Sequence, residues 1–139
     1  MPSINPYLNF AGNTEEAFKF YQSVFGGELN ITRFSDTPAG DNVPPTVRDK
    51  VMHASLPIGK DNILMATDAC EEMGFNLKQG NNYYVCISPD SKEEADKLFN
   101  GLAQDGKVNM PLADMFWGAY YGDLTDKFGI QWMVNYQAH

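Results

Sequence analysis

Hydrophobic and polar positions follow the same order of patterns twice along this chain. An alternating stretch, Ile4–Phe10, precedes a segment whose apolar side chains recur at helical spacing, and Tyr83–Ile87 precedes a second segment of this kind. Both helical segments begin with a capping residue followed three positions later by glutamate, in Asn13–Tyr21 and again in Ser91–Phe99. The repeat predicts two similar modules, each starting with a strand and a helix.

Alternating stretches also follow each predicted helix. We expect three further strands in each module, at Leu29–Phe34, Val51–Ile58 and Asn62–Thr67 in the first and at Val108–Leu112, Trp117–Leu124 and Ile130–Tyr136 in the second. The order is then βαβββ in both modules. The sequence therefore predicts an α+β fold, one domain over residues 1–139, with modules at about 1–79 and 80–139 whose curved sheets surround a shared cleft.

The segment Thr37–Asp49 interrupts the first module. It contains Pro38, Gly40, Pro44 and Pro45, which is too many helix and strand breakers for a regular element. Two interpretations stay open at this point. The segment is either a lid over the cleft or a disordered insertion without a role.

Composition narrows the classes of partner. With 139 residues and a formal net charge of −8, the chain would repel nucleic-acid phosphates and anionic membrane surfaces. No stretch approaches the roughly 20 apolar residues of a membrane span, and Met1–Asn5 lacks the basic and apolar pattern of a secretory signal. We therefore expect a cytoplasmic protein with no nucleic-acid or membrane partner, in which Cys70 and Cys86 are reduced thiols.

In each predicted strand, every second side chain points away from the helices, and these side chains indicate where a ligand would bind. These positions combine aromatic side chains with uncharged polar ones. They are Tyr7, Asn9, His53, Ser55, Met65, Thr67, Tyr84, Cys86, Trp117, Tyr121, Gln131, Met133 and Asn135. Such a lining suits a small organic ligand held by stacking and hydrogen bonds, although a partly polar second core would use the same residue types.

Three segments carry a resemblance to a known family. They are Pro6–Phe10, Phe20–Gly26 and Met115–Trp132. The chain resembles the PhnB-like branch of the glyoxalase/bleomycin-resistance/dioxygenase superfamily, also called vicinal oxygen chelate proteins, whose members are often labelled 3-demethylubiquinone-9 3-methyltransferase-like. The resemblance implies paired βαβββ modules and a homodimer. The methyltransferase label has no support in the sequence, which lacks a glycine-rich turn after a parallel strand.

The resemblance also implies where a metal would bind. Metal-dependent members of the superfamily use four inward His, Gln or Glu side chains on the first and last strands of both modules. Those positions fall at Pro6 or Tyr7, at Tyr84, and at or beside Met65 and Met133. Thioether and phenol groups are poor ligands for a hard or borderline divalent ion, so we expect no metal and no cofactor.

Three functional hypotheses remain. The first is a metal-independent binding protein for a small organic molecule. The second is a lyase, isomerase or dioxygenase that uses an unusual metal site or the imidazole of His53, a weak candidate for a general base. The third is a dimeric structural module with a filled cleft.

Overall fold

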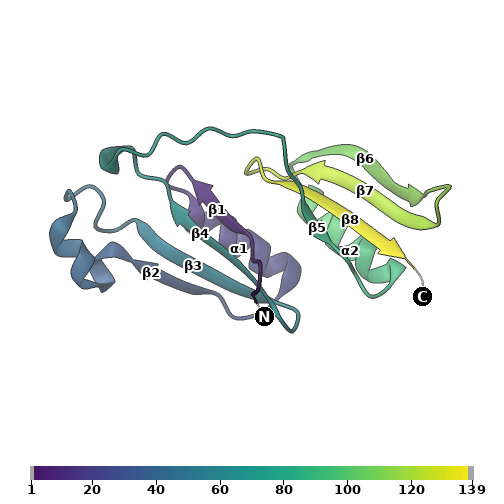
Figure 1. Ribbon diagram of the computed structural model, residues 1–139, viewed down its shortest axis with the longest axis horizontal. Helices are drawn as coiled ribbons and strands as arrows, with labels where there is room; N and C mark the ends of the chain where they lie inside the picture. The colour runs from purple at the N-terminus through teal and green to yellow at the C-terminus, as the bar shows by residue number, and fades with distance from the viewer. Residues whose placement is uncertain (1, 138–139) are drawn as a thin grey trace. The chain divides into compact units, whose positions relative to one another are not determined.

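The chain folds into two compact units that divide between Lys78 and Gln79, and the computed structural model describes residues 2–137 (Figure 1). The first unit has the order β1 (Tyr7–Phe10), α1 (Thr14–Phe25), β2 (Asn30–Arg33), β3 (Val51–Ile58) and β4 (Asn62–Asp68). The second has β5 (Val85–Ile87), α2 (Lys92–Ala103), β6 (Lys107–Asp114), β7 (Ala119–Thr125) and β8 (Gln131–Gln137). The α+β fold with two βαβββ modules is confirmed.

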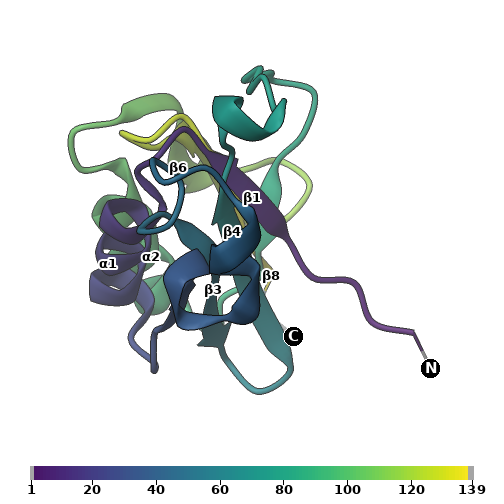
Figure 2. The same ribbon diagram turned by 90° about the vertical axis from the view of Figure 1, so that its left-hand side faces the viewer.

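Each unit contains one four-stranded mixed sheet. The strand order is β1-β4-β3-β2 in the first unit and β5-β8-β7-β6 in the second. In both, the first strand pairs in parallel with the last one, whereas the remaining neighbours are antiparallel. The helix of each unit lies against one face of its sheet, as Figure 1 shows for both units and Figure 2 shows from the side for α1. We call the opposite face of each sheet its helix-free face.

Alternation along the strands decides which side chains meet the helices. In β1, Leu8 and Phe10 are buried, and Phe10 packs edge-on against Phe18 of α1. In the second unit, Trp132 and Val134 of β8 are buried in the same way. The alternating positions between them point to the helix-free faces, as the sequence pattern predicts.

The two helices begin differently, although both carry the predicted capping pattern. At α2 the hydroxyl of Ser91 accepts a hydrogen bond from the amide of Glu94 at 3.0 Å, which is the predicted cap. At α1 the side chain of Asn13 makes no such bond. The amide of Thr14 donates instead to the Oδ1 atom of Asp68, 54 residues away, at 3.1 Å. The capping prediction is therefore wrong for α1, because a tertiary contact replaces the local one.

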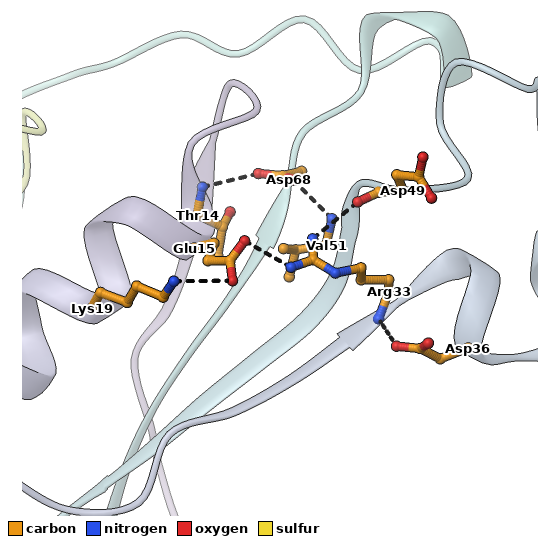
Figure 3. A network of polar contacts seen from close by, with 8 residues as sticks. All are labelled: Thr14, Glu15, Lys19, Arg33, Asp36, Asp49, Val51 and Asp68. Carbon is orange, nitrogen blue, oxygen red and sulfur yellow. Dashed lines mark hydrogen bonds and ion pairs between the residues drawn. The ribbon is translucent and has the colours of Figure 1, made fainter.

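Asp68 connects three elements of the first unit (Figure 3). Its side chain is buried at the end of β4, where Oδ1 accepts from Thr14 and Oδ2 accepts from the amide of Val51 at 2.8 Å. One carboxylate thus holds the start of α1, the start of β3 and the end of β4 together. Nearby, Glu15 of α1 bonds the guanidinium of Arg33 at 2.7 Å, and this pairing lowers the pKa of the Glu15 carboxyl.

The proline-rich segment between β2 and β3 is folded. Residues Pro38–Asn42 form a 3-10 helix, and Val47 is fully buried in a small cluster with Phe34 and Cys70. The side chain of Arg48 donates from Nε to the carbonyl of Gly40 at 3.1 Å. The interpretation as a disordered insertion is wrong, because the segment has its own hydrophobic cluster and hydrogen bonds.

Strand β6 forms an outer edge of the second sheet and is irregular. Its pairing with β7 shifts register between Val108 and Met110 and again between Met110 and Ala113, a stretch that contains Pro111. β7 begins at Ala119, so Trp117 lies in the turn before the strand. The predicted strand Trp117–Leu124 is therefore wrong at its start, since Gly118 with a φ of 93° belongs to the turn.

Candidate functional site

The helix-free face of the first sheet brings five of the predicted ligand-binding positions onto one surface. Register pairs place Tyr7 beside Met65 and Asn9 beside Thr67. His53 of β3 joins them, because the Tyr7 hydroxyl lies 3.3 Å from its Nδ1 atom and the two rings are 5.8 Å apart. The pairing of β1 with β4 also fixes the register of the first strand, because Tyr7, and not Pro6, lies beside Met65.

Tyr7 and His53 form a polar contact between two aromatic rings on the helix-free face of the first sheet. Tyr7 is 47% exposed, and its hydroxyl and the imidazole share one hydrogen bond. The nitrogen of His53 that faces Tyr7 either accepts from or donates to the hydroxyl, depending on the tautomer.

The helix-free face of the second sheet carries a more deeply placed polar group. The hydroxyl of Tyr121 donates to Oδ2 of Asp123 at 2.9 Å, and Asp123 is only 7% exposed. Burial, together with the hydrogen bond and the charge of Asp123, raises the pKa of Tyr121 to about 12. The phenol is therefore a hydrogen-bond donor at neutral pH and not an anion.

Cys86, Met133 and Asn135 share this face. Cys86 of β5 lies beside Met133 of β8, which in turn lies beside Asp123, while Asn135 lies beside Tyr121. The Oδ1 atom of Asn135 is buried and accepts no hydrogen bond within the described residues. Burial also raises the pKa of the Cys86 thiol, so this side chain is a neutral thiol.

Aromatic side chains surround the polar centre of this face. The Trp117 ring packs edge-on against Tyr121 with centroids 6.3 Å apart, although Trp117 belongs to the β6–β7 turn. Tyr84 precedes β5, and its phenol contributes to the raised pKa of Tyr121. Trp117 and Tyr84 are 51% and 43% exposed, so both rings can contact a ligand.

A groove of about 900 Å³ lies at one end of the second sheet. Its lining is mostly amides, lysines and backbone: Gln79, Gly80, Asn81, Tyr84, Asp105, Gly106, Lys107, Asn109, Thr125, Asp126, Lys127, Gly129 and Gln131. Gln131 was predicted to bind ligand, yet its Nε2 donates to the carbonyls of Gly80 and Tyr83 at 3.4 and 3.1 Å. It therefore holds the segment before β5 against β8.

The positions assigned to metal ligands do not fit a divalent ion. In the first unit they are Tyr7 and Met65, and beside Met133 the structure places Cys86 and not the expected Tyr84. A neutral phenol and two thioethers are poor ligands for a hard or borderline divalent ion, and a single cysteine does not complete a metal site. Within residues 2–137, no group of three or more His, Cys, Asp or Glu side chains has a geometry that could hold a metal ion.

Asp123 was not among the candidate site residues predicted from the sequence. The signal was present, because Asp123 is two positions after Tyr121 and so faces the same side of a strand. Its neighbour Asp126 does stabilise a turn: its carboxylate accepts from the amides of Phe128 and Ile130 and from the indole of Trp132.

Comparison with known proteins agrees with this fold. Residues 2–135 match the family model described as 3-demethylubiquinone-9 3-methyltransferase. Protein YjdN of Escherichia coli K12 is 30% identical over 141 residues, covering 95% of this chain and 93% of YjdN.

Within residues 2–137 no helix combines the length and the hydropathy needed to cross a membrane.

Solved structures show the same relationship. Protein PA1353 of Pseudomonas aeruginosa is 40% identical with a TM-score of 0.86, covering 99% of this chain and 98% of that one. The PhnB protein of Bacillus cereus is 28% identical with a TM-score of 0.74, covering 97% and 99%. A glyoxalase/bleomycin resistance protein/dioxygenase family enzyme of Burkholderia phytofirmans, 19% identical with a TM-score of 0.64 and coverage of 95% and 97%, shares the fold. The chain therefore belongs to the PhnB-like family, whose model is named 3-demethylubiquinone-9 3-methyltransferase.

Proposed function

We propose that this protein binds a small organic molecule on the helix-free faces of its sheets without a divalent metal. The observation that carries the proposal is the set of groups at these faces. Tyr7 and His53 on the first sheet and Tyr121 and Asp123 on the second offer stacking surfaces and hydrogen bonds. The positions of the usual metal ligands hold phenol, thioether and thiol groups.

Metal analysis of the purified protein tests this proposal first. We expect no stoichiometric zinc, nickel, manganese or iron, and neither heat of binding nor a raised thermal midpoint when these ions are added. A screen of small organic molecules by amide chemical shifts should then give saturable changes at the helix-free faces. Tight stoichiometric metal binding would contradict the proposal and favour a metal-dependent lyase, isomerase or dioxygenase.

The activity named in the family description does not fit these units. Cofactors with a nucleoside part are typically bound at a glycine-rich turn between a parallel strand and a helix. The β1–α1 connection contains one glycine, Gly12, and the sheets are mixed. We expect no heat of binding when S-adenosylhomocysteine is titrated into the protein.

A second candidate function rests on the contact between Tyr7 and His53. The Tyr7 hydroxyl lies 3.3 Å from Nδ1 of His53, and this contact would hold the imidazole in place for a role as general base. If the protein is an enzyme of this kind, His53→Gln should abolish turnover of any substrate found in the ligand screen, and Tyr7→Phe should reduce it. Unchanged turnover in His53→Gln would remove this candidate.

We also propose a homodimer, as the family resemblance implies. Phe116 is 97% exposed and lies edge-on to Trp117, with ring centroids 5.0 Å apart, in the β6–β7 turn. Exposed aromatic residues are enriched in protein interfaces. Light scattering should give twice the monomer mass, and Phe116→Asp should shift the mass toward the monomer.

A further inference from the structure

The helix-free face of the second sheet contains a buried carboxylate without a positive partner. Asp123 accepts one hydrogen bond, from Tyr121, and no lysine, arginine or histidine of the described residues forms an ion pair with it. Asp123 is only 7% exposed, so little of this residue is open to water, and burying a charge without a partner is costly. This cost is compensated when a positive group or several N–H donors approach the carboxylate.

Asn135 gives an independent indication on the same face. Its Oδ1 atom is buried and accepts no hydrogen bond within residues 2–137. Because Asn135 pairs with Tyr121, and Asp123 is two residues further along β7, the amide oxygen and the carboxylate belong to one patch. Both oxygen groups can accept further hydrogen bonds, so the patch can take N–H donors from a ligand.

The surroundings of the patch favour a flat organic group over a metal ion. Calcium takes six to eight oxygen ligands, whereas this patch offers one carboxylate, one amide oxygen and one phenol. Tyr84 and Trp117 are about half exposed beside it, and aromatic faces attract cations. The patch therefore combines hydrogen-bond acceptors with two neighbouring aromatic side chains.

We infer that the helix-free face of the second sheet binds a small organic cation, an amidinium, guanidinium or ammonium attached to a flat apolar group. Asp123 and Asn135 accept its N–H donors, and Trp117 and Tyr84 contact its apolar part. The inference rests on the proposed binding function, for which it names the class of ligand. The formal net charge of −8 also favours the approach of cations.

Three probes of the same shape test the charge preference. Benzamidine is a cation, benzamide is neutral and benzoate is an anion, and each can be titrated into the full chain while backbone amide chemical shifts are followed. We expect saturable shifts at Tyr121, Asp123 and Asn135 with benzamidine, binding at least about tenfold weaker with benzamide, and no binding with benzoate.

Two matched variants locate the site. Asp123→Asn removes the charge but keeps the shape, so benzamidine should bind no better than benzamide. Asp105→Asn removes one carboxylate from the groove at the end of the same sheet and should leave benzamidine binding unchanged. Asparagine is well tolerated at residue 105, where φ is 59°. Asn135→Leu, which removes the unpartnered oxygen, should fold normally and weaken benzamidine binding.

The outcomes separate the two proposals. If benzamide or benzoate binds this face as well as benzamidine does, the face binds small molecules and the inference about charge is wrong. If Asp105→Asn and not Asp123→Asn removes binding, the cation belongs to the groove and the inference is also wrong. If none of the three probes shifts this face, both the inference and the proposed binding function fail for the second sheet.

Discussion

Tyr121 has a phenol whose pKa lies well above the ordinary value for tyrosine. Burial and the acceptor Asp123 raise its pKa from 10.0 to about 12. Between these two values the unfolded chain loses the phenolic proton while the folded one keeps it, so the free energy of unfolding should fall as pH rises through this window. Below about pH 10 both forms keep the proton, and this contribution is fully present.

Urea unfolding at pH 8 and at pH 11 checks this expectation. Tyr121→Phe has no phenol, so its stability should fall less between the two pH values than that of the parent chain. The other tyrosines contribute equally to both proteins and cancel in the comparison. An equal fall in both proteins would show that Tyr121 is not held in its neutral form.

The face of the sheet on which a side chain lies could be predicted from the alternation of apolar and polar residues along each strand. The sequence placed Tyr7, Asn9, His53 and Met65 on one face, and the register pairs and the contact between Tyr7 and His53 agree. It did not identify the carboxylate of Asp123 as buried, because burial depends on neighbours from other strands. An alternating pattern predicts which face of the sheet a side chain points to, but not how deeply that side chain is buried.

At the scale of elements, Asp68 replaces the expected local cap of α1. Asp68→Asn keeps one acceptor but turns an NH₂ group toward one of two buried amide donors. We expect it to lower the free energy of unfolding by about 1–3 kcal/mol, measured by urea denaturation. Asp36→Asn changes an exposed carboxylate that also accepts from a backbone amide, that of Arg33. It should cost less than about 0.5 kcal/mol, and equal losses in both variants would contradict the assigned role of Asp68.

The turn between β7 and β8 depends on Asp126 in a similar way. Asp126→Ala leaves the amides of Phe128 and Ile130 and the indole of Trp132 without this acceptor. The expected loss is about 3 kcal/mol or more, since unpaired buried donors are costly. Asp61→Ala, an exposed residue in the β3–β4 turn, is the matched control and should have little effect. A near-normal Asp126→Ala protein would show that the turn forms without the carboxylate.

Elements with strong periodicity were the easiest to predict. Val51–Ile58 was predicted with both ends correct, whereas the strand expected from Ile4 begins at Tyr7 and the one expected from Trp117 begins at Ala119. The ends of a strand depend on which backbone groups form hydrogen bonds to the neighbouring strand, and the residue types alone do not show this. The fold of residues 37–49 was missed because its small cluster joins Val47 to Phe34 and to the distant Cys70.

At the scale of the whole molecule, the connection between the units is the segment most open to cleavage. Residues 74–82 have no helix or strand, and Phe75 is 43% exposed. Thermolysin, which cuts before large apolar residues, should therefore cleave first at Phe75 or Leu77, giving two fragments identified by mass spectrometry. Phe75→Asp combined with Leu77→Asp should slow this cut. A first cut within residues 37–49 would show that the packed segment opens more readily than the connection.

The irregular pairing of β6 has a consequence for solubility. Long, flat outer strands offer unpaired backbone groups to other chains and start ordered aggregates. β6 runs for eight residues and includes Val108 and Met110, both 43% exposed, so it has the composition of such a starting point. Pro111 provides no backbone donor, and the two register shifts bend the strand. We therefore expect these irregularities to keep the edge of this sheet from pairing with strands of other chains, even in concentrated solution.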